Sequence, residues 1–211
     1  MARFVEERLP VVLPADRLDH EHHLAGHFDR RAERARRLGD MAVTEGWAML
    51  MQHLVTEPAW LNRRLDVPRP ADLAYDGAIS LLYFVRRYSA KLLYELEFHT
   101  ADDVTALRPR YVELLGDALK IQPSETDYLA DIDSGFYVTE YLRSWAFEAQ
   151  LRAYLRERFG NAWFAKREAG SLIRDLWSEG QRINADELLK DVTGAQLEMA
   201  SVAERVRDDL N

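Results

Sequence analysis

The segment that most limits the fold of this 211-residue chain runs from Met41 to Leu54, with the sequence MAVTEGWAMLMQHL. Apolar residues occupy almost every side of a helix drawn through it, and such a helix normally lies in a protein interior. Asp40, directly after Gly39, is a suitable N-cap, so we predict a helix from Asp40 to about Val55. Other helices must cover this one, which favours a multi-helix bundle.

The rest of the chain also has a helical pattern and no convincing strand-rich region. Further helices are predicted at about Tyr75–Phe98, Phe136–Phe159, Lys166–Glu179, Ala185–Asp191 and Gly194–Asp209, and another starts in the segment HTADD. Capping-box spacing supports three of the starts, at Thr100/Asp103, Asn184/Glu187 and Thr193/Gln196, while Asp133 or Ser134 is the expected N-cap of the helix with the tyrosines. Pro58, Pro68 and Pro70 lie in a connection that cannot continue a helix. We therefore predict an all-α protein.

The composition excludes several classes of function. The 28 Lys and Arg residues are interspersed with 36 Asp and Glu, and the net charge is −8, so we expect neither a nucleic acid nor a membrane as partner. The chain has no cysteine, which excludes disulfides, thiolate metal sites and a cysteine nucleophile. Charged residues interrupt both the N-terminal segment and the most apolar segment, Ile79–Phe98. We therefore expect no signal peptide, no membrane span and a cytoplasmic location.

Glu45 is the acidic residue within the apolar segment Met41–Leu54. Its neighbours three and four positions away include Met41, Ala48 and Met49, so its carboxylate is predicted to lie on an apolar face. Burying an ionised carboxylate without a partner costs much free energy, and proteins supply a cation, a metal or a proton. Two interpretations stay open: an ion pair with an arginine from another helix, and a metal ligand.

A second candidate surface lies on the helix predicted at Phe136–Phe159. Tyr137, Tyr141, Trp145 and Glu148 follow one another at four- and three-residue intervals, so they share one stripe of that helix. Tyrosine hydroxyls at a cleft can donate a hydrogen bond to the oxyanion that develops during peptide cleavage. The alternative is a stripe that packs in the core or against another helix.

Four of the six histidines lie in the segment HEHHLAGH, residues 20–27. His23 and His27 have the four-residue spacing that places two imidazoles on one helix face, as in the zinc motif His-Glu-x-x-His. The motif is incomplete, because Leu24 follows His23 where the motif has the glutamate that acts as general base. A metal site through His23 and His27 and a solvated polar segment both stay open.

Three segments give the chain a resemblance to a known family. They are RRLGDMAVTEGWAMLMQHL from residue 36, GFYVTEYLRSWAFEAQLRAYLRERFG from residue 135 and LWSEGQRINADELL from residue 176. Together they resemble the C-terminal catalytic half of gluzincin-type zinc metallopeptidases of the thimet oligopeptidase and oligoendopeptidase group. The resemblance covers about residues 36–210, and it implies the helical part of an oligopeptidase catalytic domain, one zinc ion and a peptide substrate.

The resemblance also assigns roles to individual residues. Glu45 in TEGWA matches the third zinc ligand of the family, and Tyr141 and Tyr137 match the tyrosines that bind the substrate carbonyl or oxyanion. His23 and His27 are the candidates for the remaining zinc ligands. The N-terminal segment departs from the family, because its zinc motif is incomplete and it lies closer to Glu45 than we expect for these enzymes.

We accordingly divide the chain into an atypical segment, residues 1–35, and a helical metallopeptidase-like domain, residues 36–211. Two functions follow. The first is a zinc-dependent hydrolase of small peptides, or a C-terminal fragment of one. The second is a non-catalytic helical module that keeps the scaffold, has lost the metal and binds a peptide or another partner. A domain whose N-terminal half is missing would expose apolar surface, on Ala78–Phe98 or Met41–Met51, and would self-associate.

Overall fold

The all-α fold predicted from the sequence is confirmed for the residues that the structure describes. The structure is a computed structural model, and it describes residues 39–210. Within that range the chain forms eight α-helices and five short 3-10 helices, without a strand. The α-helices are α4 Met41–His53, α5 Pro58–Arg64, α6 Pro70–Phe98, α7 Arg108–Leu119, α8 Tyr137–Phe159, α9 Arg167–Trp177, α10 Ala185–Thr193 and α11 Ala200–Leu210. The 3-10 helices are η3 Leu54–Thr56, η4 Val104–Leu107, η5 Glu125–Tyr128, η6 Ser134–Phe136 and η7 Trp163–Ala165.

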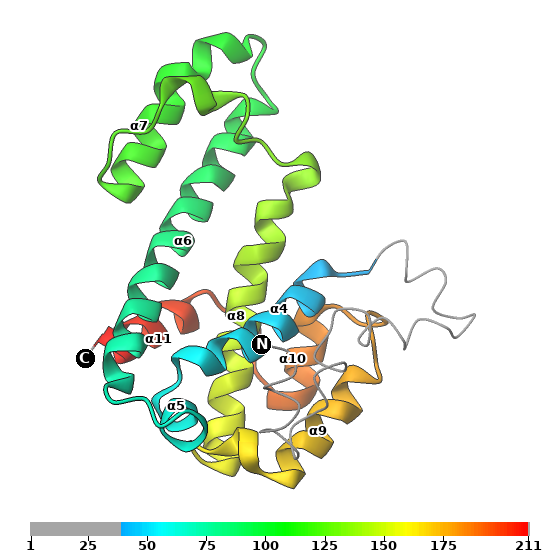
Figure 1. Ribbon diagram of the computed structural model, residues 1–211. Coiled ribbons are helices and arrows are strands. Elements are labelled where there is room, and N and C mark those ends of the chain that lie inside the picture. The colour runs from blue at the N-terminus through cyan, green and yellow to red at the C-terminus, as the bar shows by residue number, and fades with distance from the viewer. Residues whose placement is uncertain (1–38, 211) are drawn as a thin grey trace.

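Two long helices, α6 and α8, set the arrangement of the others (Figure 1). α4 crosses the lower half of α8 and packs closely against it, and α11 packs against both α6 and α8. α7 covers the upper part of α6, while α5, α9 and α10 lie around the lower end of the molecule (Figure 1). Side chains from α4, α6 and α8 therefore meet near the middle of the molecule.

The main core forms where α4 crosses α8. A Cβ atom at Gly46 would lie 2.5 Å from Cδ1 of Phe147, so the absence of a side chain at this position lets the two helices approach. Trp47, one position further, contacts Phe147 and Trp177 edge-on, with ring centroids 5.6 and 5.7 Å apart. This close contact fixes the position of α4 along α8, and with it the position of the side chains on the neighbouring face.

Some helix starts follow the predicted caps and others do not. Asp40 caps α4, accepting a hydrogen bond from the backbone N–H of Ala42, and the capping box of Asn184 and Glu187 starts α10. The other two capping-box predictions are wrong. Asp103 caps the short helix η4, so that α7 begins only at Arg108, and Thr193 belongs to the end of α10, while α11 begins at Ala200.

The proline-rich connection before α6 is more helical than predicted. Pro58 starts the short helix α5, and Pro70 starts α6 five residues before the predicted position at Tyr75. A proline is tolerated in the first turn of a helix, because its missing N–H would have no partner there. Prolines that we interpreted as helix breakers therefore act as helix starts.

The start of α8 is held by another helix rather than by a side-chain cap. Gly135 and Phe136 have φ angles of 68° and 57°, so the chain turns sharply before Tyr137. Asp133 does not cap α8 as predicted: its carboxylate lies 2.9 Å from Nζ of Lys91, and its backbone N–H donates to Glu95. Lys91 and Glu95 on α6 thus fix the segment that leads into Tyr137.

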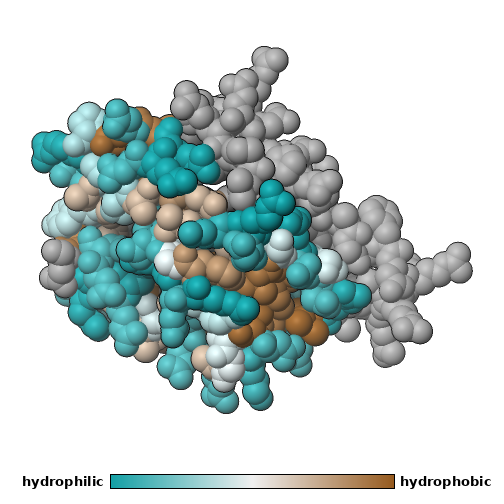
Figure 2. Space-filling model, turned by 90° about the horizontal axis from the view of Figure 1, so that it is seen from below, coloured by the Kyte–Doolittle hydropathy of each residue, from teal (hydrophilic) through white to brown (hydrophobic). Residues whose placement is uncertain are grey.

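Among the described residues, we find no helix that combines the length and the apolar character of a membrane span. The face seen in Figure 2 is mostly hydrophilic, with a compact hydrophobic area between the polar side chains. Large apolar side chains that are exposed are concentrated on α6, namely Leu73, Tyr75, Ile79, Tyr83, Phe84, Leu93 and Leu96. Much of the longest helix thus has apolar side chains in contact with solvent.

Candidate functional site

Glu45 lies on the part of α4 that faces α8, and it is half-buried. The expectation that α4 is covered all round is wrong, because Ala48 is exposed. The buried side of the helix includes Val43, Trp47 and Leu50. Glu45 stands at the border between this buried side and solvent, where its carboxylate is partly open to water and a neighbouring side chain can still hold it in one position.

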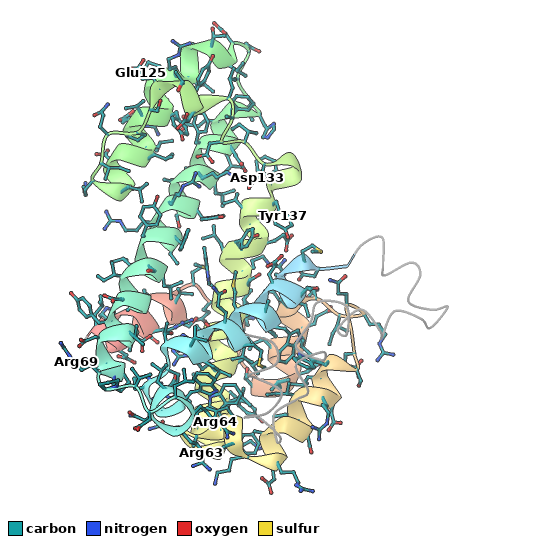
Figure 3. All side chains as sticks on the ribbon, in the orientation of Figure 1. Arg63, Arg64, Arg69, Glu125, Asp133 and Tyr137 are labelled. Carbon is teal, nitrogen blue, oxygen red and sulfur yellow. The ribbon has the colours of Figure 1, made fainter. Side chains whose placement is uncertain are left out.

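The partner of Glu45 is a phenol from α8. The hydroxyl of Tyr137 donates a hydrogen bond of 2.8 Å to Oε1 of Glu45, and the ring of Tyr141 lies 5.2 Å from that of Tyr137 in an edge-to-face contact. Figure 3 shows Tyr137 near the upper end of α8, below Asp133. Residues that stand 92 positions apart in the sequence therefore meet in one place.

The two phenols keep their protons over the physiological pH range. Burial raises the pKa of Tyr137, and the hydrogen bond to Glu45 and its negative charge raise that pKa further. Burial likewise raises the pKa of Tyr141, and the charge of Glu45 is the next largest cause. Both hydroxyls are therefore available as hydrogen-bond donors beside a carboxylate.

The remaining predicted site residues, His23 and His27, lie outside the described residues. Among the described residues, the partner of Glu45 is the hydroxyl of Tyr137 and not the arginine that one interpretation required. Residues 39–210 contain no group of three or more histidine, aspartate or glutamate side chains that could hold a metal ion. Within this part of the chain, Glu45 is thus a single candidate ligand.

A cavity of about 380 Å³ extends from Tyr141 between α4, α6 and α8. Its apolar lining includes Met49, Leu81, Phe84, Tyr88 and Trp145. The sequence pattern did not reveal Phe84 and Tyr88 as lining residues, because it cannot show which face of α6 meets α8. Of the four residues in the tyrosine stripe, Tyr141 and Trp145 line this cavity, whereas Glu148 is fully buried.

A group of buried charges lies at the end of the cavity away from Glu45. Glu148 is paired with Arg205 of α11 and, at 3.5 Å, with Nε of Arg152. Arg152 also lies 3.5 Å from Glu57, whose carboxylate is 3.4 Å from Nε2 of His53. The four-residue spacings of His53 with Glu57 and of Glu148 with Arg152 place each pair on one helix face, so the sequence could have predicted these two contacts. The sequence gives no such indication for Arg205, because it stands 57 positions after Glu148.

Comparison of the sequence with protein families and with curated proteins, and of the structure with solved structures, gives no match. The resemblance to the gluzincin group therefore remains a prediction from the residues of the three segments quoted above.

Proposed function

We propose that this protein is a zinc-dependent hydrolase of small peptides, or the C-terminal part of one, that acts in the cytoplasm. The observation that supports the proposal best is the 2.8 Å hydrogen bond from Tyr137 to Glu45, with Tyr141 in contact with the same phenol. The family resemblance assigns these three residues to a single site. Their contact where α4 crosses α8 supports a single site.

The described residues do not form a zinc site by themselves, because protein zinc sites use at least three ligands and Glu45 is one. The proposal therefore takes the other two ligands to be His23 and His27. When bound, zinc would supply a Lewis acid that polarises a peptide carbonyl. The chain's own residues would hold the substrate and orient the carboxylate.

Each tyrosine has a distinct part in this proposal. Tyr141 would donate a hydrogen bond to the peptide carbonyl oxygen, where negative charge develops during hydrolysis. Its raised pKa keeps the hydroxyl protonated for this purpose. Tyr137 would act one step away from the substrate: its hydrogen bond holds the Glu45 carboxylate in one orientation, as the partners of metal ligands commonly do.

Hydrolysis of a mixture of short peptides, followed by mass spectrometry, tests the proposal. We expect the zinc-supplemented protein to cleave peptides and a chelator to stop the cleavage. Tyr141→Phe should lower kcat by about 100-fold, the loss typical of a missing oxyanion donor. Glu113→Gln, on an exposed part of α7, serves as the control and should retain full activity. A zinc-supplemented wild-type protein that cleaves none of the peptides would contradict the proposal.

The alternative is a non-catalytic helical module that binds a peptide or a partner chain. Two observations favour it: the absence of a three-ligand group within residues 39–210, and Leu24 in place of a general base after His23. Under this alternative the protein contains no zinc, and its melting temperature does not change when a chelator is added.

A further inference from the structure

The cavity beside Tyr141 has the size and lining of a binding pocket for part of a ligand. Its volume of about 380 Å³ lies at the lower end of the range, roughly 300–1,000 Å³, found for small-molecule sites. Tyr141 belongs both to this cavity and to the candidate site around Glu45. A group bound in the cavity would therefore lie next to a substrate held by the two tyrosines.

The walls of the cavity favour an aromatic occupant. The ring of Tyr88 lies 5.3 Å from the rings of both Tyr141 and Trp145, and it meets Trp145 at 88°. Phe84 and Leu81 continue the same wall along α6. Aromatic rings attract one another most strongly in edge-to-face and offset arrangements, so a further ring can join this set.

The charges at the far end of the cavity disfavour a charged occupant. Arg205, which lines the cavity, is paired with Glu148 and lies 3.6 Å from Asp209. His53 also lines the cavity, and burial lowers its pKa, so that it is neutral near pH 7. Since the arginine already has its carboxylates, the cavity offers no free positive charge to an acidic group.

The cavity follows the face of α4 that begins at Glu45. Glu45, Met49, Gln52 and His53 stand at positions i, i+4, i+7 and i+8, which share one helix face. The eight-residue step from Glu45 to His53 spans about 12 Å, at ~1.5 Å per residue. An extended peptide of roughly four residues covers the same distance, at ~3.3 Å per residue. A peptide held at Glu45 can thus place a nearby side chain in the cavity.

We propose that this cavity selects the substrate by receiving an uncharged aromatic side chain close to the carbonyl held by Tyr141. This inference rests on the proposed function, since it takes the ligand to be a peptide. It names the substrate class: short peptides with phenylalanine, tyrosine or tryptophan beside the cleaved bond.

Binding of blocked tripeptide amides, measured by titration calorimetry with a chelator present, tests the inference without turnover. The peptides are all-alanine, or alanine with phenylalanine or aspartate at each position in turn. The best phenylalanine peptide should bind at least about tenfold more tightly than the all-alanine peptide, a difference of ~1.4 kcal/mol. The aspartate peptides should bind no better than the all-alanine peptide.

Two tryptophan variants of α6 test whether the preference for phenylalanine arises in this cavity. Ser80 lines the cavity and is exposed, so Ser80→Trp should fill the cavity and reduce the preference for phenylalanine to less than about threefold. Ser89 is exposed on the same helix and does not line this cavity, so Ser89→Trp should keep the preference. If Ser80→Trp does not fold, Phe84→Ala gives a second test. It removes an exposed wall residue and should weaken binding of the phenylalanine peptide alone.

The outcomes separate this inference from the proposed function. Three results would overturn the inference and leave peptide hydrolysis standing. They are equal binding of the phenylalanine and all-alanine peptides, tightest binding of an aspartate peptide, and equal effects of Ser80→Trp and Ser89→Trp. If the wild-type protein binds none of the peptides, the inference fails, while the cleavage assay with added zinc decides the proposed function separately.

Discussion

Two glutamates show how a side chain's environment depends on the contacts of its helix. The apolar neighbours of Glu45 predicted a sequestered carboxylate, yet Glu45 is half-buried, and Glu148, on a more polar helix, is fully buried. The reason is that α8 is covered by α4 on one side and α11 on another, whereas α4 has an exposed side at Ala48. The sequence pattern shows which residues share a face, but not how many neighbours cover it.

The contact between Tyr137 and Glu45 predicts that the pKa of Tyr137 depends on the charge of Glu45. The hydrogen bond to Glu45 and its negative charge both raise the pKa of Tyr137, so Glu45→Gln should lower this pKa. We expect NMR titration of ring-labelled tyrosine to show the change, with the resonance assigned by its loss in Tyr137→Phe. The control variant Glu113→Gln should leave the pKa of Tyr137 unchanged. An unchanged pKa in Glu45→Gln would mean that the two side chains do not interact in solution.

The buried pair of Glu148 and Arg205 predicts a large loss of stability when one partner is removed. Glu148→Gln leaves Arg152 and Arg205 buried without their shared carboxylate, and should lower the free energy of unfolding by about 3–5 kcal/mol. The exposed pair of Glu113 and Arg110 gives a matched control, because Glu113→Gln should cost less than ~1 kcal/mol. Urea unfolding measures both, and similar losses in the two variants would contradict the buried network.

At the level of elements, the sequence predicts the helices well and their starts unevenly. α4, α8 and α10 agree with prediction within about one turn, because an apolar stripe and a clear cap or a terminal glycine define them. α5 was missed and α11 was started too early. The proline of α5 and the threonine before α11 have more than one local role, and packing against other helices decides between them.

Part of the candidate site could be predicted from the sequence, because its residues lie on helices with a clear apolar pattern. Glu45, Tyr137 and Tyr141 lie on two strongly patterned helices, so their faces could be assigned from the sequence. Their mutual contact depends on the crossing of α4 and α8, which the pattern of either helix alone does not contain.

Asp40 joins three elements, and its carboxylate predicts a pH dependence. It accepts hydrogen bonds from the N–H groups of Ala42 and Ala185 and pairs with Arg143. Burial raises its pKa, but the hydrogen bonds with Arg143, Ala185 and Glu140 and the charge of Arg143 outweigh burial, and the pKa lies below the usual 3.8. Because the folded pKa is the lower one, the stabilisation is complete above the unfolded pKa and is lost as the pH falls through the folded value.

Asp40→Asn should therefore be less stable than wild type near neutral pH, and the difference should shrink as the pH falls from about 5 to about 2. At neutral pH we expect a loss of at least ~1 kcal/mol, because asparagine keeps the cap but loses the charge-assisted hydrogen bonds from Arg143. Urea unfolding at several pH values measures the difference. A difference that stays constant with pH would contradict the role of the Asp40 charge.

The close approach of α4 to α8 predicts that Gly46 cannot be enlarged. Alanine normally stabilises a helix relative to glycine by about 1 kcal/mol. In Gly46→Ala the new Cβ would lie 2.5 Å from Phe147, so we expect a lower melting temperature instead. Ala48→Leu, on the exposed side of the same helix, should leave stability within about 0.5 kcal/mol. A Gly46→Ala variant with a higher melting temperature would show that the helices are not in close contact.

For the whole molecule, the exposed apolar side chains of α6 predict association. Tyr75, Ile79, Tyr83, Leu93 and Leu96 are each at least 40% exposed, which is unusual for so many large apolar residues on one helix. We expect sedimentation velocity to show concentration-dependent self-association, and Leu93→Glu with Leu96→Glu to reduce it. Their matched control, Glu113→Gln, should associate like wild type. A monomer of ordinary solubility at high concentration would count against a domain that lacks its N-terminal half.

The zinc content of the purified protein tests the proposed function most directly. Elemental analysis gives the number of zinc ions per chain in the wild type and in Glu45→Ala, with Glu113→Gln as the control. We predict about one zinc ion per chain in the wild type and in Glu113→Gln, and none in Glu45→Ala, because loss of one of three protein ligands removes the site. Zinc-free wild-type protein, or equal zinc in all three proteins, would contradict the assignment of Glu45 as a metal ligand.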